Sequence, residues 1–411
     1  MQNDWPQQLD EIVERQVPEM ISVRRHLHAH PESSGQEWQT TTYLGELLTK
    51  GGYHVRRGPD ERGLLVDTPE VGPGQRLALR ADIDALRIQE QTPSDYCSQV
   101  PGIMHGCGHD VHTAILCGTL LALRQAALEQ ILPKPLRWRG IFQPAEETNR
   151  GALEMIGAGG MHEIAAILAL HVDPSRPVGT IATCVGPFTA ACDEVKILVE
   201  GRGGHAARPH ESIDSIAVAA QLISSIYLFV PRSVDSHDPV VVTFGQVHAG
   251  DSPNVIPARV MLRGTVRTLG EEVRRRTKEH IRQLARGLAQ ASGARIHVEF
   301  LSGPESVRND PYLTALIRKS AAEVLGPESV HEIARPSMGG EDFANFLQQA
   351  PGAMFRLGCC GKEMGCPPLH SPQFDPDERC LPVGAKILAR AAVLWSDPDP
   401  LLHATALRKL S

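Results

Sequence analysis

The chain has 411 residues, of which 42% are hydrophobic and 22% are charged, and its formal net charge is −7. This length is too great for one compact hydrophobic core, so we expect two domains, and the composition is typical of a soluble globular protein. The negative charge argues against nucleic acid as the main partner, because phosphate binding needs a concentrated basic surface.

Helices and strands alternate through the first half of the chain. The periodicity predicts a helix over residues 36–50, a strand over 75–84, a helix that begins near His109, a strand over 136–143 and a short apolar strand over 165–172. This alternation predicts an α/β fold, in which helices cover the faces of a sheet.

The pattern changes near residue 187. The next part contains, in order, the strand CDEVKILVEGRGG, a helix over about 212–230, the strands PVVVTFGQV and ARVMLRGTVRT, a helix over 270–290 and the strand ARIHVEFL. Such a block is typical of a small antiparallel α+β unit. We therefore predict that residues 188–302 form a second domain, inserted into a first domain that comprises residues 1–187 and 303–411.

Targeting signals are not evident in the sequence. The N-terminal segment MQNDWPQQLDEIVERQ is polar and acidic, and no run of 18 consecutive apolar residues follows it. We therefore expect neither a secretory signal nor a membrane span. The nine cysteines are scattered along the chain, which favours reduced thiols over a disulfide framework, so we expect a cytoplasmic protein.

Cysteine, histidine and glutamate gather at the ends of predicted strands and in the loops that follow. The segments are GCGHD (106–110), QPAEET (143–148), ALHV (169–172) and LHSP (369–372). Sites in open α/β sheets form at such strand ends. Glycines flank Cys107 and let the backbone turn, so that Cys107 and His109 can face one ion. A buried thiol beside a helix-capping histidine is an equally good interpretation of these two residues alone.

The pair Glu146 and Glu147 follows a strand and Pro144. Two solvated surface carboxylates are the usual outcome for such a pair. Adjacent side chains point in different directions, however, so one carboxylate can bind a metal while the other accepts a proton from water at that metal. His171 and His370, each taken alone, are more typical of hydrogen-bonded structural histidines.

Taken together, these residues indicate a metal site more specifically than any one of them does alone. Five possible ligands are enough for two ions that share a bridging ligand, and they are Cys107, His109, Glu147, His171 and His370. Thiolate and imidazole suit zinc, and the carboxylate also suits manganese. We therefore predict two divalent ions per chain, either zinc or manganese, and place His112 on the packed face of its helix.

Nine segments between about residue 20 and residue 395 resemble, in order, those of one enzyme family. The segments are RRHLHAHPE, ALRADIDALRIQE, GIMHGCGHDVHTAIL, FQPAEET, LALHV, GRGGHAARPH, NVIPARV, GGEDFA and LHSPQFD. They resemble the dinuclear metallo-amidohydrolases, which include hippurate hydrolases, N-acyl-amino-acid aminoacylases and auxin-conjugate hydrolases. The resemblance implies a zinc-peptidase-like mixed sheet flanked by helices, with an inserted ferredoxin-like lid domain that often forms a dimer interface.

The resemblance also implies roles for individual residues. It implies metal ligation by Cys107, His109, Glu147, His171 and His370, with Cys107 as the bridge. Glu146 resembles the family's general base, which takes a proton from the attacking water and delivers it to the leaving amine. Asp84 resembles an acid that orients a ligand histidine. From the sequence alone, a strand-end turn aspartate is an equally good interpretation of Asp84.

Three residues of the predicted lid resemble substrate contacts. They are His205, Asn254 and Arg267. In relatives, the histidine reaches the active site of the neighbouring protomer and helps to bind the substrate carbonyl. Arg267 could pair with the free carboxylate of an amino acid, because its guanidinium group binds carboxylates bidentately. A surface histidine on a turn and an outward-facing strand arginine are the alternatives.

The leading hypothesis is a homodimeric amidohydrolase that cleaves the amide bond of small N-acyl amino acids. The alternatives are a deacetylase of N-acetyl diamino acids, a dipeptidase, a non-catalytic metal-binding relative and a thiol redox protein that uses Cys107. The presence of Glu146 argues against a non-catalytic relative, and Cys107 belongs to no CxxC pair. Arg87, Gly106 and Asp173 depart from the family pattern, which leaves the acyl and amino acid preferences open.

Overall fold

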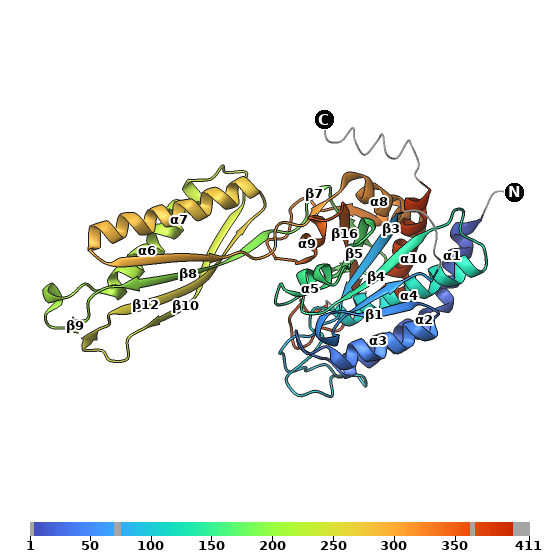
Figure 1. The fold of residues 1–411 in the computed structure, drawn as a ribbon, viewed down its shortest axis with the longest axis horizontal. Helices are drawn as coiled ribbons and strands as arrows, with labels where there is room; N and C mark the ends of the chain where they lie inside the picture. The colour runs from blue at the N-terminus through green and yellow to red at the C-terminus, as the bar shows by residue number, and fades with distance from the viewer. Residues whose placement is uncertain (1–3, 70–74, 362–365, 398–411) are drawn as a thin grey trace. The chain divides into compact units, whose positions relative to one another are not determined.

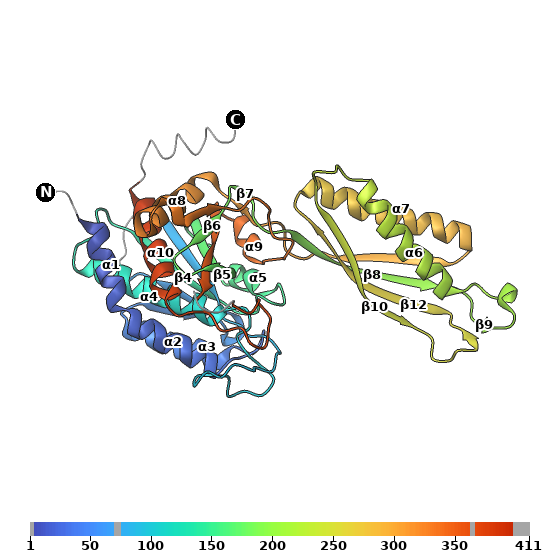
Figure 2. The ribbon, with the colours of Figure 1, turned by 180° about the vertical axis from the view of Figure 1, so that it is seen from behind.

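The computed structural model describes residues 4–69, 75–361 and 366–397. The chain divides into two compact units. Unit 1 contains the described residues up to Phe188, together with Arg308–Ala334 and the residues from Asn345 onward. Unit 2 contains Thr189–Val307 and Arg335–Ala344. Figures 1 and 2 show the elements of each unit from opposite sides.

Unit 1 is built on a mixed sheet whose eight described strands have the order β1-β2-β4-β3-β5-β16-β6-β15. The strands are β1 (His54–Arg57), β2 (Leu64–Asp67), β3 (Arg76–Asp82), β4 (Arg137–Gln143), β5 (Ile164–Pro177), β6 (Ile181–Thr183), β15 (Val330–Glu332) and β16 (Gly352–Cys360). At the centre, β3 is parallel to β4 and β5, and β5 is parallel to β16. The short strands β7 (Gly186–Pro187) and β14 (Arg308–Asn309) form a separate pair.

Helices cover both faces of this sheet. Six consecutive residues of β3 and six of β4 are buried, and successive strand residues point to opposite faces. The helices are α1 (Trp5–Arg15), α2 (Val17–Ala29), α3 (Trp38–Lys50), α4 (His109–Leu128), α5 (Gly151–Gly157), α8 (Pro311–Leu325) and α10 (Cys380–Ser396), and the chain returns from unit 2 through α9 (Phe343–Leu347). The central helix α4 packs against α1, α2 and α10. Its N-terminus lies at the end of β3, because Thr113 donates a hydrogen bond to the carbonyl oxygen of Asp82, the last residue of that strand.

Unit 2 has the order of elements β8 (Ala191–Glu200), α6 (Ser215–Phe229), β10 (Val240–Ala249), β12 (Arg259–Thr268), α7 (Glu271–Ser292) and β13 (Arg295–Leu301). Its sheet is antiparallel with the order β10-β12-β8-β13. Burial alternates strictly along β8, because one face packs under α6 and α7 and the other does not (Figures 1 and 2). This is the ferredoxin-like arrangement that the family resemblance predicts.

Two helical segments are long and apolar enough to cross a membrane, namely His109–Leu128 and Ser215–Arg232. The first is α4, which is 72% buried, so its apolar composition reflects its position in the core of unit 1. The second includes α6 and is 33% buried. One side of α6 packs on the sheet of unit 2, while Ile216, Leu228 and Phe229 are exposed.

Candidate metal centre

The candidate ligands of unit 1 lie on segments that meet at one edge of its sheet. β3 and β4 run in parallel and end at Asp82 and Gln143, so the loops that carry Asp84 and Glu147 begin side by side. His109 is the first residue of α4. His171 lies within β5, beyond the last residue of that strand that pairs with β3. The fold therefore brings candidate ligand side chains from the ends of β3 and β4, the start of α4 and the middle of β5 to one edge of the sheet.

Two groups of ligand atoms share Cys107. The atoms of Cys107, His109 and His171 all lie within 4.8 Å of one another, and so do those of Cys107, Glu147 and His370. Within these groups, Sγ of Cys107 is 3.5 Å from Nε2 of His171. Oε1 of Glu147 is 3.5 Å from Nε2 of His370. All five predicted ligands therefore come together, with the thiol common to both groups.

Two of the histidines are oriented by main-chain oxygens. Nδ1 of His109 lies 2.8 Å from the carbonyl oxygen of Asp84, and Nδ1 of His171 lies 2.8 Å from that of Val172. A carbonyl oxygen only accepts, so Nδ1 carries the hydrogen in both rings. In the neutral form of each ring, Nε2 is then the nitrogen whose lone pair can bind an ion, which is the usual arrangement in histidines that bind metals.

Two buried atoms have unfulfilled bonding capacity. Among the residues that the structure describes, none forms a hydrogen bond with Nε2 of His109 or with Oε1 of Glu147. These two atoms are 3.8 Å apart. Leaving such groups buried and unbonded is costly, and a divalent cation would satisfy both. The donor set of thiol, imidazole and carboxylate fits zinc or manganese.

The protonation equilibria of the ligands differ with their surroundings. Burial raises the pKa of Cys107 to about 12. Burial, with the positive charge of Arg356, holds the pKa of His171 well below its usual value. Burial opposes protonation of His109, but the charges of Asp82 and Cys107 outweigh it and raise its pKa. A cation would therefore displace protons from Cys107 and His109 on binding.

Asp84 connects two of the ligand-bearing segments. Its Oδ1 lies 3.2 Å from Nδ1 of His109, and its Oδ2 accepts a hydrogen bond from the backbone N–H of Glu147 at 3.1 Å. Ser34 donates to the same Oδ2 at 2.6 Å. Burial raises the pKa of Asp84, but the hydrogen bonds from His109 and Ser34 outweigh this and lower it. The carboxylate therefore orients one ligand side chain and the backbone of another.

His370 has an unusual backbone conformation. Its φ angle is +64°, a left-handed value that non-glycine residues adopt only at some cost. Its backbone N–H donates to the carbonyl oxygen of Gly106 at 2.8 Å. This bond ties the loop of His370 to the loop of Cys107, which explains how the strained conformation is held.

The predicted substrate contacts lie in unit 2. His205 belongs to β9 (Gly204–His205), which pairs with β11 (Val255–Ile256), and the N–H of Ala206 donates to the carbonyl oxygen of Asn254. His205 and Asn254 are thus close together, and both are exposed. Arg267 is half-buried and donates to the carbonyl oxygen of Met338. It lies eight residues along β12 from Arg259, roughly 26 Å in an extended strand, so the fold separates it from the other two.

Residues 78–393 match the protein family described as Peptidase family M20/M25/M40. The chain belongs to peptidase family M20. This match, with the similarities below, confirms the family, the α/β fold with a mixed central sheet, and the hydrolytic class of enzyme that the sequence predicts.

The names of proteins similar to this M20 chain describe different hydrolytic activities. An N-acetylcysteine deacetylase of Bacillus subtilis is 40% identical over 376 residues, which cover 91% of this chain and 96% of that one. Thermostable carboxypeptidase 1 of Saccharolobus solfataricus is 37% identical over 389 residues, covering 92% and 95%. A solved structure, a dinuclear metal binding peptidase of the M20 family from Bacillus subtilis, has a TM-score of 0.80 at 35% identity and covers 93% and 99%.

Sequence reasoning missed one residue that supports this M20 site. Oε1 of Glu37 accepts hydrogen bonds from the backbone N–H groups of Gly35 and Ala145, each at 2.8 Å. Ala145 has a φ angle of +52° and directly precedes Glu146. Glu37 therefore holds the turn that carries the two glutamates. Glu37 precedes a helix, and only the folded structure reveals its contact 108 residues further along the chain.

Proposed function

We propose that this M20 enzyme hydrolyses the amide bond of small N-acyl amino acids and releases a carboxylic acid and a free amino acid. Two divalent ions, zinc or manganese, would be held by Cys107, His109, Glu147, His171 and His370. The observation that carries the proposal is that Cys107 belongs to both ligand groups, as a bridging thiolate would. When bound, such ions polarise an amide carbonyl and make water a stronger nucleophile.

Glu146 is the proposed general base. It is 8% exposed, and a carboxylate oxygen of Glu146 lies within 4.8 Å of ligand atoms of both His109 and Glu147. Its carboxylate would take a proton from the attacking water and pass it to the nitrogen of the leaving amine. Burial favours this role, because charge–charge interactions are stronger where water is excluded.

The substrate class is supported by the relatives. The name of the N-acetylcysteine deacetylase describes a small acylated amino acid, whereas that of the carboxypeptidase describes a peptide substrate. We favour N-acyl amino acids because identity to the deacetylase is slightly higher. A deacetylase of N-acetyl diamino acids or a dipeptidase is the second candidate. His205 is proposed to reach the active site of the neighbouring protomer and bind the substrate carbonyl there, which suits its separation from Arg267 within one chain. Asn254 is proposed to help hold the substrate, and Arg267 to bind its carboxylate.

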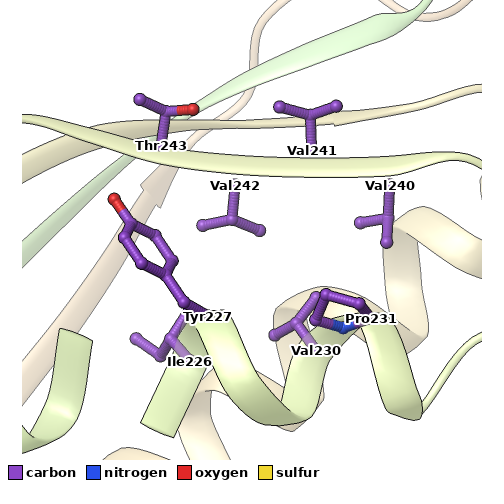
Figure 3. Close-up of a pocket in the computed structure, with 8 residues that line it drawn as sticks. All are labelled: Ile226, Tyr227, Val230, Pro231, Val240, Val241, Val242 and Thr243. Carbon is purple, nitrogen blue, oxygen red and sulfur yellow. The ribbon is translucent and has the colours of Figure 1, made fainter. Parts of the chain in front are cut away.

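We also propose that the enzyme is a homodimer through unit 2. β10 is an edge strand, paired with β12 and with no other described strand. Beside it lies a hollow of about 400 Å³ between α6 and β10, lined by Tyr227, Val230 and Val242 among others (Figure 3). Tyr227, Leu228 and Phe229 are 45–58% exposed. Pairing of β10 with β10 of a second copy would cover this apolar surface and the unpaired edge.

A cytoplasmic location is proposed from the thiols. None of the nine cysteines, all of which lie in the described residues, forms a disulfide, and several of them are buried in the core. Unpaired thiols persist in reducing compartments, whereas secreted proteins tend to oxidise them.

The test combines metal content with turnover. The purified chain should bind about two ions, and it should cleave N-acetyl or N-benzoyl amino acids only when zinc, manganese or cobalt is present. Cys107→Ser should lose bound ions, whereas Cys117→Ser, which changes a buried thiol within α4, should keep them. Absence of bound metal, with no activity on adding it, would overturn the proposal. Two ions with cleavage of dipeptides alone would favour the second candidate.

A further inference from the structure

A chain of buried polar contacts runs beneath the metal centre, from β4 across β3 and α4 to β5. Oε1 of Gln143 accepts from Nε of Arg80 at 2.8 Å, and Nη1 of Arg80 donates to Oδ2 of Asp82 at 2.8 Å. Nδ1 of His112 lies 2.6 Å from Oδ1 of Asp82. The backbone N–H of Val172 donates to Nε2 of His112 at 3.0 Å. The four side chains are 0–2% exposed.

The hydrogen bond from Val172 determines the tautomer of His112. A backbone N–H can only donate, so Nε2 of His112 must be the acceptor and Nδ1 must carry the hydrogen. Nδ1 then donates to Asp82.

Ligand atoms of Asp82, His109 and His112 also lie within 4.8 Å of one another, as those of a metal site would. Both nitrogens of His112 are nevertheless already engaged, so this group is unsuited to a third ion.

The position of His112 relates it to two ligands at once. It lies three residues after His109 on α4, and its ring centroid is 5.5 Å from that of His109 and 4.7 Å from that of His171. Its partner Val172 directly follows His171 in β5. The pairing of β3 with β5 ends at Arg80 and Ala169. Val172 lies beyond the part of β5 that pairs with β3. There, the side chain of His112 accepts the hydrogen bond of the Val172 backbone N–H.

We infer that His112 is a positioning residue, which through its bond to Val172 fixes the spacing between His109 and His171 and so the shape of the ligand group formed by Cys107, His109 and His171. Asp82 holds the ring of His112, and His112 holds the backbone beside His171. This inference rests on the proposed function, because it assigns a role within the proposed metal centre. We assign neither Asp82 nor His112 to metal ligation or to substrate contact.

Two substitutions separate the two contacts of His112. In His112→Gln, the side-chain oxygen can reach the place of Nε2 and accept from Val172, but the bond to Asp82 is lost. In His112→Asn, the amide nitrogen can take the place of Nδ1 and donate to Asp82, but the bond to Val172 is lost. Thr113→Val is the matched control, because it removes a hydrogen bond to the carbonyl oxygen of Asp82 without affecting β5.

The measurement is Co²⁺ binding to the full chain, followed by visible absorption and by the thiolate-to-cobalt charge-transfer band of Cys107. We expect His112→Asn to bind one of the two ions at least tenfold more weakly and to shift this band. His112→Gln should stay within about threefold of the wild-type affinity. Thr113→Val should lower the melting temperature and leave Co²⁺ binding unchanged.

Several results would overturn the inference. Unchanged affinity and spectrum in His112→Asn would leave His112 with a structural role alone. Equal weakening in His112→Asn and His112→Gln would remove the specific role of the bond to Val172. If His112→Asn does not fold, a tenfold loss of affinity in His112→Gln contradicts the inference by itself. Failure of the wild-type chain to bind Co²⁺ would instead overturn the proposed metal centre.

Discussion

The proposed ligands in unit 1 and the proposed substrate contacts in unit 2 are held very differently. His109 and His171 are 1% and 7% exposed, and their rings are oriented by the main-chain oxygens of Asp84 and Val172. His205 and Asn254 are exposed, and within the part of the chain that the structure describes their side chains bond only to Ala207 and Ser252, two positions away. Ligands that are positioned before an ion arrives bind it tightly, whereas exposed contacts must lose conformational entropy when the substrate binds.

The largest effect is expected at Glu146 in unit 1, which we propose as the general base and not as a metal ligand. Glu146→Gln should lower kcat by a factor on the order of 10²–10⁴, because the proton acceptor is lost, while both ions remain bound. Turnover and metal content measured on the same sample check this. Glu147→Gln is the control and should lose bound metal. Full turnover in Glu146→Gln would show that another group is the base.

A second test concerns the buried network that supports the N-terminus of α4. His28 lies 2.8 Å from Oδ2 of Asp110 and 3.1 Å from Oε1 of Glu90. Burial opposes protonation of His28, but Asp110 and Glu90 raise its pKa from 6.5 to about 9. A raised pKa means that the protonated form stabilises the fold. This contribution is present in full below pH 6.5 and is lost as the pH rises through 9.

The free energy of unfolding should therefore fall between pH 6 and pH 9.5, by up to about 3 kcal/mol from this group. Chemical denaturation at both pH values measures the difference. His28→Gln should be less stable at pH 6 and should show a smaller change over the same range. The same pH dependence in the variant and in the wild type would exclude His28 as its source.

A third test concerns Asp84, whose hydrogen bonds orient His109 and the backbone of Glu147. Asp84→Asn keeps the shape of the side chain but removes its charge, and places an N–H among three donors. We expect the affinity for the ions to fall by about 10–100-fold, as measured by competition with a chelator. Asp67→Asn, at the end of β2, is the control for general destabilisation. Equal ion affinity in both variants would contradict the role of Asp84.

The smallest effect is expected in unit 2. His205→Ala should lower kcat/KM by about tenfold, the value of one hydrogen bond, and should leave the ion content unchanged. Steady-state kinetics with an N-acyl amino acid measures this. His237→Ala changes another exposed histidine of unit 2 and should have no effect. If the two variants behave alike, His205 is an ordinary surface residue.

Much of the fold follows from local patterns in the sequence. The strands over 75–84 and 136–143 and the helix from His109 are confirmed to within a few residues, because apolar periodicity reflects burial on both faces of a covered sheet. β5 is longer than its apolar run. It continues through the polar residues Asp173–Pro177, because pairing with β16 extends to Pro177. The sequence pattern does not predict this extension, because it depends on pairing with β16, which is distant in the sequence.

The residues of the candidate site were predictable to the extent that their side chains have distinctive chemistry. Cys107 and Glu147 attract attention by type and by their place after predicted strands. The sequence predicts that His112 lies on the packed face of its helix, and the side chain is buried there, but its bonds to Asp82 and Val172 arise only in the folded chain. Glu37 was missed entirely. An ordinary aspartate or glutamate becomes a positioning group only through contacts that the tertiary fold creates.

The bond between His370 and Gly106 has a consequence for the order in which the centre forms. His171 is made 199 residues before His370. At about 5–20 residues per second, a ribosome needs roughly 10–40 s to synthesise the intervening chain, which includes all of unit 2 up to Val307. All residues of the group of Cys107, His109 and His171 are therefore synthesised well before His370, which completes the second group.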